Sequence, residues 1–461
     1  MLVLGRFALA APRRIYRPAN RRTGVAAHAP ARGARRECGI ITVINIEGNF
    51  VKRFVLLLAS IAISALLGAC GNSSTSADAA PDFKATAGDA SVTLTWTATP
   101  NVDYWLFYAA GTTVTSTNWA SIGGKAIVSA VSPYTISGLT NNTAYSFTMN
   151  ARKNGGPGGP GAPTQVVTPR LAGSNWTVNA PLGTGRLNGV SANTAAAVIV
   201  GSGGTIFAGA PGAIPTAQTN PGAPADLNAV INGGVGFVTV GNAGTVVFSA
   251  DGATWATKTS GTVADLYAVT TTGTGAFLAV GAAGTIIASV DGSTWTTPTS
   301  GTTKNLYGAT FGLGRYVAVG ATGTIVTSTD AATWTSVASN TTNDLRAVTL
   351  GSFVTTTGTG TTAVTTTTNL FVALGAAGTL VTSADGLTWT ARTPISTSTI
   401  NASTFSGQFV AVGTAGKIYT SLDGITWQAQ NSGTTSDLNA LARTVTGYTA
   451  VGAAGTNIAS Q

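Results

Sequence analysis

The side chains that most often act as general bases or metal ligands are few in this chain, and His, Glu and free Cys occur only near its start. The 461 residues include 24 Lys plus Arg, 15 Asp plus Glu and a single His. That histidine, His28, and both glutamates, Glu37 and Glu47, precede Cys70, and no further thiol follows Cys70. General bases and metal ligands are usually His, Glu or Cys side chains. We therefore expect a protein that is not an enzyme, with no catalytic residues, no metal site and no cofactor.

The positive charge of the chain is also confined to its start. The formal net charge is +9, but eleven of the 24 basic residues and two of the 15 acidic residues precede Cys70. Thirteen of each remain, so the downstream sequence is neutral. Sequence-independent binding of nucleic acid needs a clear excess of Lys and Arg. We expect no nucleic-acid partner.

An apolar segment before Cys70 has the layout of a secretory signal. Lys52-Arg53 precedes an apolar run over residues 54–67, which is too short for the alternative of a membrane-spanning helix. The end of this segment, Leu67-Gly68-Ala69-Cys70, resembles the lipobox of bacterial lipoprotein signals. The resemblance implies a signal peptide over residues 51–69 and a lipid on Cys70 as the membrane anchor. With Gly71 next, it also implies the outer membrane of the cell envelope.

Residues 1–50 precede this signal, although a signal normally begins a chain. They are rich in Arg and Pro and lack apolar periodicity, and a GTG start codon could encode Val51. We interpret residues 1–50 as an untranslated upstream region. The alternative is a genuine extension, whose Arg-rich arm in the cytoplasm would agree with the positive-inside rule. Beyond Cys70, small polar residues predict a flexible tether over residues 70–80.

Residues 81–170 show the short alternating strands of a β-sandwich. Apolar and polar residues alternate over residues 91–96, 104–108 and 144–149. The segment resembles a fibronectin type III domain, and the matching residues include Trp96, Tyr104, Leu106, Leu139 and Tyr145. The resemblance implies a tyrosine corner, in which the buried hydroxyl of Tyr145 bonds to the backbone. We expect this domain to act as a spacer.

Seven sequence repeats occupy residues 171–461. Each repeat reads L-x-A-V, then F-V-A-V-G, then G-T-I-x-x-S, then D-G-x-T-W. The repeats open at Leu187, Leu227, Leu266, Leu306, Leu345, Ile400 and Leu438. Four short strands in about forty residues are typical of one blade of a β-propeller. The sequence therefore predicts an all-β protein, a sandwich followed by a seven-bladed propeller.

Two irregularities of the repeats carry further expectations. The last repeat ends at Gln461 without its D-G-x-T-W strand, whereas Trp176 lies just before the first repeat. We expect the N-terminal strand around Trp176 to complete the final blade and close the ring, which leaves no open edge. A Thr-rich insert over residues 355–368 lengthens the fifth repeat, and we expect an extended hairpin or loop there.

Each repeated Asp precedes a small residue between two strands, where a tight hairpin favours Asp-Gly. The aspartates are Asp251, Asp291, Asp330, Asp385 and Asp423, and Trp255, Trp295, Trp334, Trp389 and Trp427 follow four residues later. These segments resemble the Asp-box, or BNR repeat, of sialidase-like propellers and of photosystem II assembly-factor-like propellers. The resemblance implies structural turns away from any active centre. A sialidase-like hydrolase stays open as an alternative, because two Asp carboxylates could hydrolyse a glycoside.

Ligands of propellers generally bind at the mouth of the central channel, which the opening strand of each repeat lines. The candidate ligand-binding residues follow the opening Leu or Ile, and are Asn188, Asn228, Tyr267, Tyr307, Arg346, Asn401 and Asn439. Their amide, phenol and guanidinium groups suit sugars or peptide backbone. One place earlier, Asp226, Asp265, Asp344 and Asp437 could form an acidic rim. Packing between blades and capping of strand ends are the structural alternatives for both rings.

Together these features predict a monomeric, lipid-anchored envelope protein whose propeller binds an envelope protein or a glycan without catalysis. A sialidase-like carbohydrate-active hydrolase is one alternative. An assembly factor for an envelope complex is the other.

Overall fold

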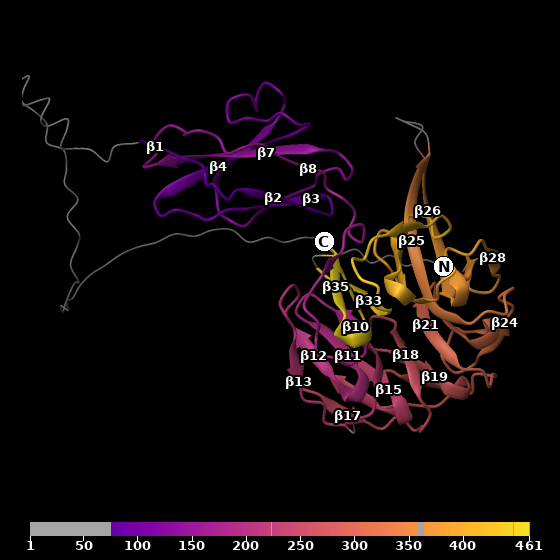
Figure 1. The fold of residues 1–461 in the computed structure, drawn as a ribbon. Coiled ribbons are helices and arrows are strands. Elements are labelled where there is room, and N and C mark those ends of the chain that lie inside the picture. The colour runs from indigo at the N-terminus through magenta and orange to yellow at the C-terminus, as the bar shows by residue number, and fades with distance from the viewer. Residues whose placement is uncertain (1–74, 223, 358–363, 446, 461) are drawn as a thin grey trace, which may run out of the picture. The chain divides into compact units, whose positions relative to one another are not determined.

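The computed structural model describes residues 75–222, 224–357, 364–445 and 447–460 (Figure 1). These residues form β-strands joined by turns and short 3-10 helices. The predicted upstream region, the signal peptide and Cys70 lie outside them, so their assignments stay predictions. No helix among the described residues is long and apolar enough to cross a membrane.

The first part of the described chain is a pair of antiparallel sheets. One sheet has the order β1(Thr75–Ala77), β7(Tyr145–Lys153), β4(Val102–Ala110), β5(Lys125–Ala130), with β8(Gln165–Val167) also paired to β7. The other has the order β2(Lys84–Gly88), β3(Ser91–Thr95), β6(Tyr134–Ser137). Alternate residues of β3 are buried, as the two-residue period of a strand with one buried face requires.

The sandwich core contains the aromatic residues that the sequence singled out. Trp96 and Tyr104 are buried, with ring centroids 5.7 Å apart, and Leu106 is fully buried. The backbone N–H of Thr140 donates a hydrogen bond to the Tyr145 hydroxyl over 3.2 Å. Tyr145 itself is half-buried, not buried as expected, because it begins β7 at the end of the sheet.

Seven antiparallel sheets follow among the described residues. Their strands, from the innermost outward, are β10(Leu187–Ala192), β11(Ala197–Gly201), β12(Ile206–Gly209), β13(Thr216–Gln218); β14(Leu227–Asn232), β15(Phe237–Gly241), β16(Val246–Ser249), β17(Ala256–Lys258); β18(Leu266–Thr271), β19(Phe277–Gly281), β20(Ile286–Ser289); β21(Leu306–Gly312), β22(Arg315–Gly320), β23(Ile325–Ser328), β24(Thr335–Val337); β25(Leu345–Thr357), β26(Val364–Gly375), β27(Leu380–Ser383), β28(Thr390–Arg392); β29(Ile400–Phe405), β30(Phe409–Gly413), β31(Ile418–Ser421), β32(Gln428–Gln430); and β33(Leu438–Arg443), β34(Tyr448–Gly452), β35(Asn457–Ser460), β9(Thr177–Val178).

The third sheet has three strands where the others have four. Its outermost segment makes an isolated bridge between Ala288 and Thr296. Two residues later stands Pro298, which has no backbone N–H to donate to a further ladder bond. The other sheets carry a residue with an N–H at this place, for example Lys258, which pairs with Val246.

The inner strands contact one another in cyclic order, and β33 contacts β10 (Figure 1). The second strand of each sheet lies between neighbouring sheets, and β15, β19 and β30 are buried at every residue. A short 3-10 turn follows each second strand: η1(Ser202–Gly204), η2(Asn242–Gly244), η3(Ala282–Gly284), η4(Ala321–Gly323), η6(Ala376–Gly378), η7(Thr414–Gly416) and η8(Ala453–Gly455). The last residue of each turn is Gly. At Gly244 a Cβ atom would lie 2.0 Å from the Thr262 carbonyl oxygen.

The last sheet is completed by the strand that precedes the first. β9 pairs with β35 through Val178 with Ile458 and Thr177 with Ala459, the closing pairing that the sequence predicts. The backbone N–H of Gly173 donates to Ser460 Oγ over 2.6 Å. In a complete repeat both partners of this bond lie in one turn, as Gly252 and Ser249 do. The segment just before the first of the seven sheets and the end of the last sheet therefore supply the two halves of one turn.

The Thr-rich insert lengthens the first hairpin of the fifth sheet. β25 and β26 stay paired out to Thr357 and Val364, as expected of an extended hairpin. Residues 358–363 lie outside the described residues.

Replacing Ser460 by Ala should destabilise the ring, because the buried N–H of Gly173 would lose its acceptor. An unsatisfied buried donor costs about 1–3 kcal/mol. Denaturant unfolding of the Ser460→Ala variant measures this loss of unfolding free energy. The matched variant is Ser249→Ala, which removes the equivalent bond to the N–H of Gly252 inside a complete repeat and should lower the stability in the same way. Unchanged stability of both variants would show that this bond contributes nothing.

Candidate functional site

Every inner strand contains a β-bulge at the residue after its opening Leu or Ile. In β14, Leu227 pairs with Gly241 and Ala229 pairs with Val240, so Asn228 is skipped. The same skip occurs in the other six inner strands. The skipped residues are the seven candidates Asn188, Asn228, Tyr267, Tyr307, Arg346, Asn401 and Asn439, and all line one channel cavity of about 440 Å³. A bulge re-aims its side chain, which explains why the seven converge.

The four asparagines of this ring join neighbouring sheets. Each donates its side-chain N–H to the carbonyl oxygen of the next opening residue, as Asn188 does to Leu227 over 3.0 Å and Asn228 to Leu266 over 2.9 Å. Asn401 donates to Leu438 over 2.9 Å, and Asn439 donates to Leu187 over 2.8 Å. The bond from Asn439 joins the last sheet to the first. These amides therefore join neighbouring sheets, and each of them spends at least one of its two side-chain N–H donors on that bond.

Among the described contacts, three consecutive units lack this bond. Tyr267, Tyr307 and Arg346 stand where the other units have Asn, and we call these three residues the open arc. The two tyrosine rings lie 5.7 Å apart, and the Arg346 guanidinium lies 5.4 Å from the Tyr307 ring. The tyrosines are half-buried and Arg346 is exposed. Burial, with the charge of Asp265, raises the pKa of Tyr267 above its ordinary value of 10.0. Like any phenol, it is protonated at neutral pH and can donate a hydrogen bond.

The acidic rim is a second set of bonds between sheets. Asp265 accepts a hydrogen bond from the N–H of Ala243 over 2.8 Å, and Asp344 accepts one from Thr322 over 2.9 Å. Asp226, Asn305 and Asp437 make the equivalent bonds to Gly203, Ala283 and Ala415. The N–H groups belong to turn residues with positive φ. No group of three acidic, His or Cys side chains in the described part of the chain is arranged to hold a metal ion.

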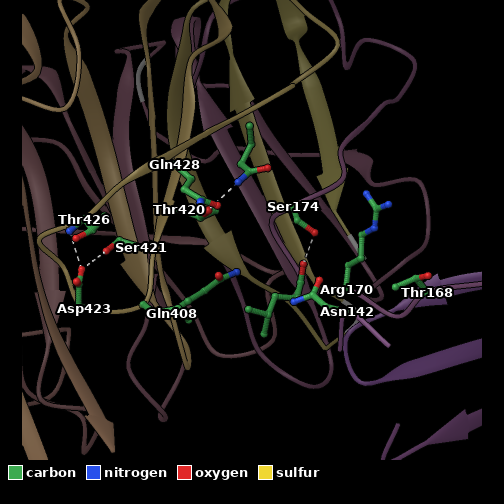
Figure 2. A pocket seen from close by; sticks show the side chains of 13 residues that line it. Asn142, Thr168, Arg170, Ser174, Gln408, Thr420, Ser421, Asp423, Thr426 and Gln428 are labelled. Atoms are coloured by element: carbon green, nitrogen blue, oxygen red, sulfur yellow. Dashed lines mark hydrogen bonds between the residues drawn. The ribbon is translucent and has the colours of Figure 1, made fainter. Parts of the chain in front are cut away.

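The repeated aspartates organise their own turns. Asp423 accepts hydrogen bonds from Ser421 Oγ over 2.9 Å and from the N–H of Thr426 over 2.7 Å (Figure 2). It accepts a third from the N–H of Ile425 over 2.8 Å. Asp251, Asp291, Asp330 and Asp385 make the same bonds. In the third of the five turns Ala331 replaces Gly at a φ of 60°, which disfavours a residue with a side chain.

The repeated tryptophans fill the space between sheets. Trp255, for example, packs with Val198 of the preceding sheet and Phe237 of its own. Its indole N–H donates to the Gly252 carbonyl oxygen over 3.1 Å. Trp255, Trp295 and Trp389 are buried, and Trp334 and Trp427 are half-buried. The Asp and Trp side chains of these turns therefore serve the scaffold and do not line the channel cavity.

The channel cavity has no acidic lining among the described residues. Its charged lining residues are Arg346 and Arg443. Hydrolysis of a glycoside by paired carboxylates would need two acidic groups facing the substrate. The described channel does not offer that pair.

A second cavity of about 670 Å³ lies along the outer strands of the sixth sheet (Figure 2). Gln408, Gln428 and Gln430 line it, with Leu171 and Ser174. The Gln408 amide donates to the Ala172 carbonyl oxygen, and Gln430 donates to Thr420 Oγ1 over 2.9 Å. The sequence did not single out these residues, because the other repeats do not share them.

Comparison with known proteins adds information on the fold. No protein-family model matches the sequence, and no curated protein matches it. Among solved structures, a streptogramin B lyase is similar over 63% of this chain and 99% of its own, with a TM-score of 0.51 and 10% identity. YCF48 from Cyanidioschyzon merolae covers 62% of this chain and 98% of its own, with a TM-score of 0.46 and 15% identity. YCF48 bound to a D1 peptide has a TM-score of 0.47 and 16% identity, and covers 62% of this chain and 96% of its own.

The topology and the likeness to the lyase define the ring of sheets as a β-propeller. At 10% identity, this similarity shows the fold alone and does not indicate an activity.

The turn aspartates should make the stability of the propeller depend on pH below about 4. Hydrogen bonds from the N–H groups of Thr333 and Ala332 and from Ser328 lower the pKa of Asp330 to about 2. A carboxyl with a pKa below its unfolded value of about 3.9 stabilises the fold above that value and loses this effect as the pH falls through the folded pKa. Melting temperatures from pH 5 to pH 2 should therefore fall less steeply for Asp330→Asn than for the parent. Equal slopes would contradict this role.

Proposed function

We propose that this protein is a non-catalytic binding module of the cell envelope, anchored by a lipid on Cys70. In this proposal the seven sheets are the blades of a seven-bladed propeller, with the Asp-box turns on its outer strands. Residues 81–170 are a fibronectin type III spacer. The lipobox resemblance supports the anchor and the outer-membrane location, and the Thr140 to Tyr145 bond supports the fibronectin-like assignment.

The open arc carries the proposal of a binding site. Four of the seven units use the bulged residue to bond to the next sheet, whereas Tyr267, Tyr307 and Arg346 do not. No side chain of a preceding unit donates to the carbonyl groups of Leu306, Leu345 and Ile400 among the described contacts. The arc thus gathers two phenol rings, a guanidinium group and backbone acceptors on one side of the mouth.

These groups suit a glycan or a segment of an envelope protein. Tyrosine rings give apolar contact area and a hydrogen-bonding hydroxyl, and Tyr and Arg are enriched among residues that dominate binding energy. A hydrolase is less well supported, because no acidic residue in the described part of the chain lines the channel cavity.

Cross-linked capture from cell envelopes, with a glycan array in parallel, tests this function. A variant with Tyr267, Tyr307 and Arg346 changed to Ala should lose capture by about tenfold or more, since residues of this kind can each contribute about 2 kcal/mol. Arg392→Ala is the matched control, because Arg392 is exposed on the outermost strand β28 of the sheet that also holds Arg346. If the triple variant captures the same material as the parent, the open arc is not the binding site.

A further inference from the structure

We propose that Arg443 forms an anion-binding position at the end of the channel opposite to the open arc. Arg443 is the last residue of β33, four residues beyond the bulged Asn439, and it lines the channel cavity. A strand rises about 3.3 Å per residue, so Arg443 lies about 13 Å along the channel from the ring of bulged residues. The inference goes beyond the proposed function and does not depend on the open arc.

Arg443 combines an unpaired guanidinium nitrogen with a place in the channel lining. Its Nη1 atom is buried and has no hydrogen-bond partner among the described residues. Buried polar groups are nearly always paired, so an unpaired guanidinium nitrogen needs an explanation. The Tyr448 ring is the neighbouring aromatic group, with its centroid 5.0 Å from the guanidinium carbon. The buried Nε atom of Arg152 is unpaired as well, but Arg152 does not line the channel. Its guanidinium carbon lies 3.5 Å from the Trp105 ring centroid, a close stacking contact that accounts for its position.

The charge of the cavity indicates the class of ligand. Arg346 and Arg443 are its charged lining residues, and no described carboxylate lines the cavity. Outside that lining, burial and the charge of Asp89 raise the pKa of the neighbouring Tyr448, while Arg443 lowers it. A guanidinium group matches the geometry of a carboxylate or a phosphate, which accept two parallel hydrogen bonds from it. The expected ligand group is therefore an oxyanion, either a carboxylate on a sugar or a phosphate, held in a cavity of the size that takes small ligands.

A purely structural role for Arg443 and a role in anion binding predict opposite changes in melting temperature when the guanidinium is removed. If the contact with Tyr448 were the reason for Arg443, its removal would lower the melting temperature. If Arg443 is held ready for an anion, Arg443→Met should raise the melting temperature of the ligand-free protein by about 2 °C. Methionine keeps the apolar stem and removes the unpaired charge.

Titration of the full chain with inorganic phosphate and with trigalacturonate tests the proposal, and galactotriose is the uncharged match for trigalacturonate. We expect at least one of the two anions, and not galactotriose, to bind the parent, with an affinity that falls as salt is added. Arg443→Met should weaken this binding at least tenfold, Arg443→Lys should retain part of it, and Arg392→Met should leave it unchanged.

The pattern of binding identifies the source of the oxyanion. Binding of trigalacturonate alone indicates a sugar carboxylate, and binding of phosphate alone indicates a phosphate group. The proposal is overturned if the parent binds neither anion, or if Arg443→Met binds as tightly as the parent. Loss of capture by the open-arc variant with unchanged anion binding separates the two sites.

Discussion

The innermost strand of each propeller sheet has one edge without a partner strand, and the rest of the structure depends on how that edge is satisfied. Unpaired backbone groups at an edge need other partners. Here the bulge turns an Asn side chain from one sheet onto the edge of the next, as Asn228 does to Leu266. The strands must then approach closely, and the residue after the bulge is small throughout: Gly189, Ala229, Ala268, Gly308, Ala347, Ala402 and Ala440.

The same constraint explains how the ring closes and, in the proposed function, where it binds. At the junction of first and last sheets, Asn439 bonds to Leu187 and Ser460 bonds to Gly173, so closure uses the same bonds as the interior of the ring. The open arc gives up three such bonds in consecutive units. Binding sites commonly cost stability in this way. In the proposed function, the four units whose Asn bonds to the next sheet stabilise the ring, and the three units of the open arc contribute less.

The repeat made most of the architecture predictable from the sequence. The opening residues begin the inner strands at the predicted positions, and Trp176 marks the strand that completes the last sheet. The bulge was not predictable, because a skipped residue alters pairing without leaving a distinct residue type. Packing between sheets was an alternative for Asp226 and Asn228 on sequence grounds, but the particular partners of their bonds were visible only in three dimensions. Arg443 was missed because the repeat has no fixed residue at its position.

The most direct test of the central claim replaces Tyr267, Tyr307 and Arg346 together by Asn and compares the melting temperature with that of the triple Ala variant. The account predicts that the Asn variant is the more stable of the two. Each new amide can donate to the carbonyl of Leu306, Leu345 or Ile400, and such a bond contributes about 0.5–1.5 kcal/mol. An Asn variant that melts at or below the temperature of the Ala variant would contradict the claim that the open arc is a gap in the bonding of the ring.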